Sequence, residues 1–170
     1  MKTPLKLKPL EKTYHARPLH VRLIGIDFGM KRIGLAVCGP DQTMASPAGT
    51  ITRTNFYNDI AELMAIIEDY DAGGVIFGWP LNMDGTEGAM CDRIRSFADE
   101  LSKKPIFQEK IDWIATFDER LSTQSVEEFL VKDVDMSRTK RKKVIDKLAA
   151  QKILQSALDR IEILEKTKKP

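Results

Sequence analysis

Histidine is nearly missing from this chain of 170 residues, which contains two, His15 and His20, both close to the N-terminus. The sequence therefore argues against reactions that need a histidine base in the folded domain, such as those of a Ser-His-Asp triad or a Cys-His pair. Cysteine is equally scarce, because Cys38 and Cys91 lie far apart and outside any CxxC spacing. That excludes a disulfide scaffold and a structural zinc site, and it fits a reducing compartment, for which we expect the cytoplasm.

Long apolar runs are absent too, since none approaches the roughly 18 residues that cross a bilayer, and we expect no membrane partner. The charges nearly cancel, with 27 Lys and Arg against 25 Asp and Glu, so the overall balance does not itself indicate nucleic acid. The chain is 42% hydrophobic and 31% charged, which suits one packed core and argues against wholesale disorder. Its length is that of a single domain.

The first 20 residues differ in character from the rest. They are basic and contain Pro4, Pro9 and Pro18, which deny this segment a continuous helix. They lack the apolar centre of a secretory signal, and the prolines argue against an amphipathic targeting helix. We therefore predict a flexible leader at residues 1–20 in preference to a targeting peptide, then one domain at 21–165 and a tail at 166–170.

From residue 21 onward the hydrophobic pattern predicts an α/β domain. Apolar runs bounded by turn residues predict strands, and apolar residues at helical spacing predict helices. The expected strands are 21–27, 33–38, 48–53, 74–77 and 111–117, and the expected helices are 58–70, 92–103, 122–131 and 143–164. The first three strands form a meander, and right-handed crossovers then place the later strands beside the first one, which gives a mixed sheet.

Acidic residues interrupt the apolar pattern where two of these strands end. Asp27 closes the first strand, and Asp118 and Glu119 close the last one. Ligands of open α/β sheets bind at such strand ends, so these carboxylates are candidate site residues. The structural alternatives are a turn residue that caps its own hairpin for Asp27, and a surface ion pair with Arg120 for the other two.

Asp146 stands out by its place on the final helix. Together with Ala150, Ile153 and Ala157 it falls on one helix face, so a charged residue opens the stripe that should face the sheet. The alternative is an acid in the first turn that interacts favourably with the helix dipole. Such a residue would sit more naturally on the polar face, with Lys147 or Lys152.

Three carboxylates that converge in this way repel one another unless a cation lies between them. Oxygen ligands without histidine or cysteine favour Mg²⁺ or Mn²⁺ over zinc. Two such ions about 4 Å apart can activate a water molecule and stabilise the leaving oxygen of a phosphodiester. The predicted chemistry is therefore phosphodiester hydrolysis with two Mg²⁺ or Mn²⁺ ions.

Five motifs carry a family resemblance, in order and over most of the chain. They are GIDFGMKRIGLAV (25–37), ASP (45–47), GWPLNMDGTEG (78–88), DERLST (118–123) and DKLAAQKILQSALD (146–159). Together they resemble the YqgF/RuvX family, which is similar to RuvC-type Holliday junction resolvases. The resemblance implies a ribonuclease H-like fold with a mixed five-stranded sheet flanked by helices. Members are named as nucleases for the 5′ end of pre-16S rRNA, and some as junction resolvases.

The resemblance implies that Asp27 is the metal ligand of the first strand and Asp146 that of the final helix. RuvC-type enzymes carry a further acid at the end of the fourth strand, but that strand reads GVIFGWPL here and offers none. Asp118 or Glu119 is left as the substitute. We favour Glu119 as the ligand, because its longer side chain could reach a site beside the first strand, and we keep both as candidate catalytic residues.

Basic residues flank each acidic landmark, which favours a polyphosphate partner over a merely solvated surface. Lys31 and Arg32 follow Asp27 in the first hairpin, and Arg120 follows the acids of the last strand. The rest precede Asp146, namely Arg138, Lys140, Arg141, Lys142 and Lys143.

The sequence thus predicts a metal-dependent nuclease, a hydrolase acting on structured nucleic acid as a monomer or homodimer. The favoured substrate is the 5′ end of pre-16S rRNA, in ribosome biogenesis, and the alternative is a branched DNA junction. An ATPase of the actin and hexokinase type is disfavoured, because 170 residues cannot hold its second domain. A non-catalytic RNA-binding module remains a further alternative.

Overall fold

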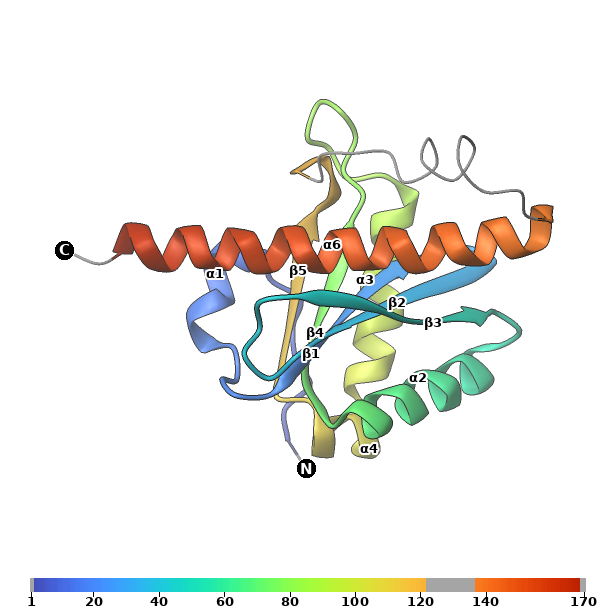
Figure 1. Ribbon diagram of the computed structural model, residues 1–170. Helices are drawn as coiled ribbons and strands as arrows, with labels where there is room; N and C mark the ends of the chain where they lie inside the picture. The colour runs from blue at the N-terminus through green and yellow to red at the C-terminus, as the bar shows by residue number, and fades with distance from the viewer. Residues whose placement is uncertain (1, 122–136, 169–170) are drawn as a thin grey trace.

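A five-stranded sheet forms the centre of the computed structural model, which describes residues 2–121 and 137–168 (Figure 1). The strand order is β3-β2-β1-β4-β5, in which β1, β2 and β3 pair antiparallel while β4 and β5 run parallel to β1. This arrangement confirms the mixed five-stranded sheet. The strands are β1 (Arg22–Phe28), β2 (Arg32–Cys38), β3 (Ala45–Thr52), β4 (Ala72–Trp79) and β5 (Trp113–Asp118).

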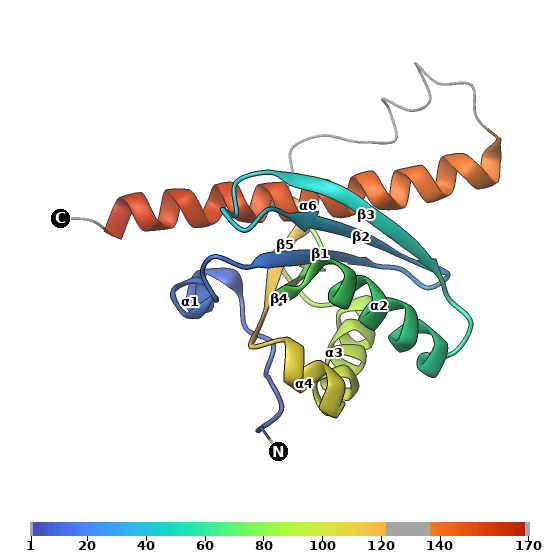
Figure 2. The same cartoon turned by 60° about the horizontal axis from the view of Figure 1, so that its bottom comes forward.

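Helices cover both faces of the sheet, as Figure 2 shows. One long helix, α6 (Arg138–Lys168), lies across one face, and α2 (Phe56–Tyr70), α3 (Ala89–Ser102) and α4 (Pro105–Lys110) cover the other. Helix α4 is absent from the expected elements, because Pro105 begins a new helix there instead of only ending the previous one. The helix expected at 122–131 lies outside the described residues.

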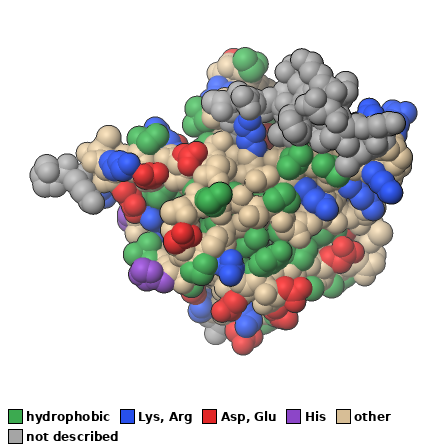
Figure 3. Space-filling model, viewed as in Figure 1, with side chains coloured by type: hydrophobic (Ala, Val, Ile, Leu, Met, Phe, Trp, Pro, Cys, Tyr) green, Lys and Arg blue, Asp and Glu red, His purple; other side chains and the backbone are tan. Residues whose placement is uncertain are grey.

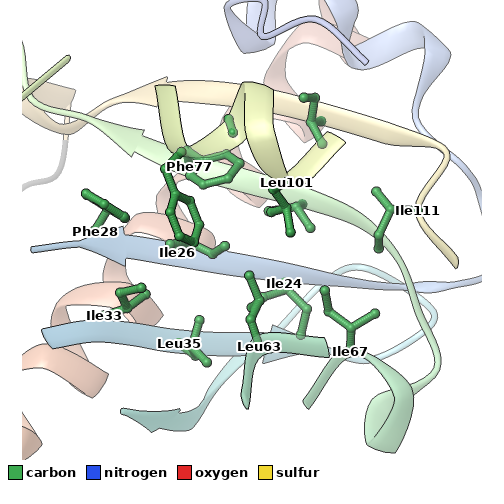
Figure 4. Packing of buried hydrophobic residues seen from close by; sticks show 14 of the residues in the cluster. Ile24, Ile26, Phe28, Ile33, Leu35, Leu63, Ile67, Phe77, Leu101 and Ile111 are labelled. Atoms are coloured by element: carbon green, nitrogen blue, oxygen red, sulfur yellow. The ribbon is translucent and has the colours of Figure 1, made fainter. Parts of the chain in front are cut away.

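Side-chain alternation along β1 assigns its residues to the two faces. Ile24, Ile26 and Phe28 point toward α2 and α3, where they join the larger hydrophobic cluster (Figure 4). Leu23 lies in the second cluster, with Ala150, Leu154 and the other buried residues of α6. Asp27 follows Leu23 by four residues and therefore faces α6. The buried stripe of α6 agrees with the predicted one.

The N-terminal segment is part of the fold, so the prediction of a flexible leader at residues 1–20 is wrong. Leu10 is fully buried in the short helix α1 (Leu10–Thr13), and the Trp113 indole Nε1 donates to the Thr13 carbonyl at 3.0 Å. Along the edge of β5, the Thr116 amide donates to the Lys8 carbonyl at 2.9 Å. The segment covers the edge strand β5 and provides hydrogen-bond acceptors for its backbone and for the buried Trp113 indole. The composition of the segment does not reveal that β5 needs these partners.

Helix α6 also runs past the predicted domain end at residue 165, and Lys166 and Lys168 lie in its last turn. Lysines at a helix C-terminus are favoured by the helix dipole, so the charged residues expected to form a tail extend the helix instead. Despite its length, α6 is too polar to span a bilayer. No other helix within residues 2–121 and 137–168 combines the length and the apolar character needed to cross a membrane.

Truncating Leu10 tests the docking of this segment. We expect Leu10→Ala to lower the free energy of unfolding by about 2–5 kcal/mol, because it opens a cavity in a filled core. Urea denaturation measures this value, and Leu19→Ala is the control, since Leu19 in the same segment is 58% exposed. Equal, small effects in both variants would contradict the docked arrangement.

Candidate functional site

Three of the predicted carboxylates lie at the carboxyl end of the parallel strands. Asp27 is the penultimate residue of β1, Glu119 directly follows β5 in a 3₁₀ turn (η2, Glu119–Leu121), and Asp146 lies in α6 above β2. Strand β4 lies between β1 and β5 and ends in the same direction. Residues far apart in the sequence therefore meet at one edge of the sheet, where ligands of such sheets bind.

Gly78 explains how Glu119 reaches this edge. A Cβ atom at position 78 would lie 2.5 Å from Glu119 Oε1 and 2.7 Å from Ile153 Cδ1, closer than real Cβ contacts. The missing side chain on β4 thus leaves the space that the Glu119 carboxylate occupies. The family resemblance implies an acid at the end of β4, which this chain lacks, and the acid that follows the neighbouring strand β5 occupies the space over β4.

Asp146 is positioned by a close approach between α6 and β2. A Cβ atom at Gly34 would collide with the backbone carbonyl of Asp146, so only glycine lets the helix come this near. The Asp146 carboxylate is not free in the structure, because Arg32 Nε donates to its Oδ2 at 2.6 Å. Arg32, predicted as a nucleic-acid contact, lies between the end of the sheet and the helix, where it is the ion-pair partner of Asp146.

Asp27 and Glu119 are the two acids of the site whose pKa values are raised. Burial, and then repulsion from Asp146, raise the pKa of Asp27 from 3.8 to about 6. Burial, then repulsion from Asp27 and Asp118, raise the pKa of Glu119 from 4.5 to about 7. Neither side chain forms a hydrogen bond or ion pair with any described residue. Two carboxylates are thus held close together without a donor or cation to neutralise them.

Asp118 lies in a different environment. Its carboxylate accepts from Arg120 Nη2 at 2.8 Å, and the Arg120 hydrogen bonds hold the pKa of Asp118 below its usual value. Arg120 also donates to the Met83 carbonyl of the loop that follows β4. Asp118 and Arg120 therefore form the surface pair that was the alternative interpretation, while Glu119 is the acid that faces Asp27.

The residues present suit a hard divalent cation in part. Asp27 and Glu119 offer oxygen ligands with no competing donor, which fits Mg²⁺ or Mn²⁺. Within the residues that the structure describes, however, no three acidic, histidine or cysteine side chains are arranged to hold one ion. Asp146 is the acid that remains bound elsewhere, to Arg32. A third carboxylate ligand would come from Asp146, whose Oδ2 this ion pair holds.

The predicted basic residues occupy three positions around these acids, and the first is that of Arg120 in η2, paired with Asp118. Lys31 lies in the turn before β2, beside Arg32. Five more lie in the first turns of α6, namely Arg138, Lys140, Arg141, Lys142 and Lys143. Figure 3 shows Lys and Arg side chains gathered over that end of the helix. Arg141 is half-buried, and the other four are exposed. The segment is helical from Arg138 on, although residue 143 was the predicted start.

Sequence reasoning missed the support of the β1–β2 turn. Arg53 Nη1 donates to the Gly29 carbonyl at 3.1 Å, and the Arg53 amide donates to the Lys31 carbonyl at 2.8 Å. Asp59, buried at the start of α2, holds the Arg53 guanidinium at 3.1 Å. Glycine inside a strand, as at positions 34 and 78, is a sequence signal of close backbone approach. The Arg53–Asp59 pair has no comparable signal.

The sheet topology and the carboxylates at its edge define a ribonuclease H-like domain. RuvC of T. thermophilus, solved with a Holliday junction, shares the fold with a TM-score of 0.52 at 15% identity, covering 89% of this chain and 99% of its own. The predicted fold class is thus confirmed. The profile of the RuvX family, described as Holliday junction resolvase, matches residues 21–160. The chain belongs to this family.

Close relatives cover nearly the same length. A protein from Rhodospirillum centenum is 46% identical over 144 residues, which are 85% of this chain and 76% of that protein. One from Nitrobacter hamburgensis is 42% identical over 166 residues, 98% of each chain. Both are provisionally named pre-16S rRNA nucleases.

The raised pKa of Glu119 predicts a pH-dependent stability in metal-free buffer. The folded protein keeps this proton to higher pH than the unfolded chain, so the free energy of unfolding falls as the pH rises from about 4.5 through 7. We expect Glu119→Gln to be more stable than wild type by about 1–3 kcal/mol at pH 8 and unchanged near pH 4. Urea denaturation across this range measures the difference.

Asp118→Asn is the matched control with the opposite sign. In the wild type the pKa of Asp118 is lowered in the folded state, so its charged form stabilises the fold. Asp118→Asn should therefore be slightly less stable than the wild type above pH 4, and this difference should fade as the pH falls below 3.8. A loss of stability in Glu119→Gln at pH 8 would contradict the repulsion between Glu119 and Asp27.

Proposed function

We propose that this chain is a metal-dependent nuclease that hydrolyses phosphodiester bonds of structured nucleic acid, with the 5′ end of pre-16S rRNA as its substrate. The carrying observation is the pair of half-buried carboxylates, Asp27 and Glu119, whose pKa values are raised and which lie without a donor beside Asp146. A structural role would have supplied a partner for them. Perturbed carboxylates clustered at a strand end are typical of functional sites.

The names of the relatives support the substrate. Proteins 42% and 46% identical over most of this chain carry a provisional pre-16S rRNA nuclease name, and the family is described by junction resolution. Both activities hydrolyse a phosphodiester, so the reaction class is common to them. The choice of ribosomal RNA rests on the relatives, while the geometry supports the chemistry.

In the proposed mechanism, Asp27 and Glu119 hold Mg²⁺ or Mn²⁺ ions, with Asp146 as the further ligand once it leaves Arg32. Such ions supply an activated water and stabilise charge on the leaving oxygen. Positive charge bound between the acids would offset their repulsion, so Asp27 and Glu119 would both be ionised at neutral pH. Arg32, freed from Asp146, lies at the same edge to contact a phosphate. Asp118 stays bound to Arg120 and orients the start of the η2 turn.

The basic side chains around this edge suit the proposed partner. Lys31 lies on the turn beside Asp27, Arg120 lies beside Glu119, and the basic residues of α6 precede Asp146 on the same helix. Nucleic-acid backbones are bound by such arrays, which position the strand without reading its sequence.

The family description favours one alternative, resolution of a four-way DNA junction. Symmetric cleavage of such a junction requires two sites, so this substrate demands a homodimer, whereas a single cut in RNA needs only a monomer. Purified protein with Mg²⁺ or Mn²⁺, given precursor RNA spanning the 5′ end of 16S rRNA and a DNA four-way junction, decides between the substrates.

Removing any metal-binding carboxylate should abolish cleavage. We expect Asp27→Asn, Glu119→Gln and Asp146→Asn each to lower the rate at least about a hundred-fold, because each removes a ligand of the ions. The cleavage rate at saturating metal measures this. Asp118→Asn is the control and should keep most of the activity. An inactive Asp118→Asn beside an active Glu119→Gln would reverse the assignment of these two acids.

The basic residues of α6 should govern affinity and its salt dependence. We expect replacing the exposed Lys140, Lys142 and Lys143 with alanine to flatten the slope of log K against log salt by about two to three, if each contacts a phosphate. Fluorescence anisotropy with labelled RNA, at several salt concentrations, measures the slope.

The matching control removes three exposed lysines elsewhere, Lys12, Lys103 and Lys110. It should leave the slope unchanged, because α1, α4 and the C-terminal end of α3, where Lys103 lies, are away from the end of the sheet that carries the acids. An unchanged slope in the α6 variant would show that its basic residues are only a solvated helix start.

A further inference from the structure

A groove lies on the face of the sheet opposite α6, next to the turn that follows Asp27. Its volume is about 470 Å³, within the range of small-molecule sites. Phe28 and Met30 come from β1 and the turn, Phe56 opens α2, and Phe97 lies on α3. The remaining lining residues are Arg53, Asp92, Arg93, Ser96 and Glu100.

The floor of this groove is aromatic. The rings of Phe28 and Phe97 are 4.8 Å apart between centroids, and those of Phe56 and Phe97 are 5.7 Å apart. Met30 is half exposed at its edge. A flat apolar group that enters the groove therefore meets ring edges and a thioether, which are favourable contacts for another aromatic ring.

The charges at the rim are neutralised, with one exception. Asp92 pairs with Arg95 and Glu100 with Lys103, both along α3. Arg53 is held by Asp59 under the turn.

Arg93 makes no ion pair within the described part of the chain. Its Nη1 lies 3.0 Å from the Met30 sulfur, and the exposed Ser96 hydroxyl has no hydrogen-bond partner among the described residues either. One guanidinium and one hydroxyl thus remain available above an aromatic floor. That combination suits a nucleotide, with its base on the floor and its phosphate at the cation.

The groove and the candidate active site share the β1–β2 turn. Successive residues of a strand point to opposite faces, so Asp27 faces α6 while Phe28 faces the groove. Arg53 fixes the turn through the carbonyls of Gly29 and Lys31, which makes this shared wall preformed. A single strand whose phosphate lies at the carboxylates reaches the groove by passing over this turn.

We propose that the groove binds one unpaired nucleotide of the substrate strand, its base inserted between Phe56, Phe97 and Met30 and its phosphate held by Arg93. The proposal rests on the proposed nuclease function and adds that the strand must be single-stranded on one side of the cut. A fully paired duplex cannot turn a base into the groove without losing its pairing and stacking.

The test is an abasic scan of a precursor RNA oligonucleotide around the cleavage site, with affinity measured in an Asp27→Asn background so that the RNA stays intact. We expect one abasic position to weaken binding roughly five- to a hundred-fold, as loss of one stacked base does. The Ser96→Trp exchange, which fills the groove, should weaken binding of intact RNA and erase the effect of that abasic position.

Arg93→Gln provides a second variant that does not depend on a bulky side chain. It should weaken binding of intact and abasic RNA alike, because it removes the phosphate contact and not the base. Lys110→Gln on α4, which removes the same charge, should have no effect. Equal affinities for every abasic position, or an abasic effect that persists in Ser96→Trp, would overturn the proposal while leaving a cleaving wild type intact. A wild type that binds and cuts no nucleic acid would overturn the proposed function itself.

Discussion

The close contact between α6 and the sheet is the constraint on which the site depends. Positions 25, 34 and 78 are glycines on the face of the sheet that α6 covers. Each of them lies against a residue of α6, and Gly78 also lies against Glu119. Asp146 can lie over β2 only because Gly34 has no Cβ. Glu119 can lie over β4 only because Gly78 has none. A single substitution by alanine at either position would displace an acid, although glycine itself takes no part in the chemistry.

The same packing creates the repulsion that gives the site its character. Burial under α6 removes water from Asp27 and Glu119 and places each near another carboxylate, Asp146 for Asp27 and Asp27 for Glu119. Both effects raise the pKa values of the two acids. The free energy that this costs the folded protein is available to any cation that enters, because binding then relieves it. Arg32 already relieves this repulsion at Asp146, through an ion pair with Oδ2 that competes with a divalent ion for the same carboxylate. Binding of a metal ion by Asp146 therefore competes with its ion pair to Arg32.

Local patterns revealed much of this in the sequence, and tertiary contacts hid the rest. The strands, the buried stripe of α6 and the position of Asp146 on it follow from hydrophobic period, which acts over a few residues. The docking of Leu10 could not be foreseen, because it depends on the free edge of β5, which exists only in the folded sheet. Helix α4 was hidden for a similar reason, since Pro105 reads equally as the end of one helix and the start of another. The Arg32–Asp146 pair joins residues over a hundred positions apart, and no spacing rule connects them.

The β1–β2 turn links the two faces of the sheet, and its construction explains why it need not be flexible. Its carbonyls are held by Arg53, whose guanidinium is fixed in turn by the buried carboxylate of Asp59 and lies over the Phe28 ring at 4.5 Å. Removing either member of such a buried pair leaves an uncompensated charge, so both are constrained together. Asp27 precedes this turn, and Arg32 follows it. The position of the reactive edge on the α6 face is therefore determined partly by a salt bridge on the opposite face, and a nucleotide bound against Phe56 and Met30 would contact the same support.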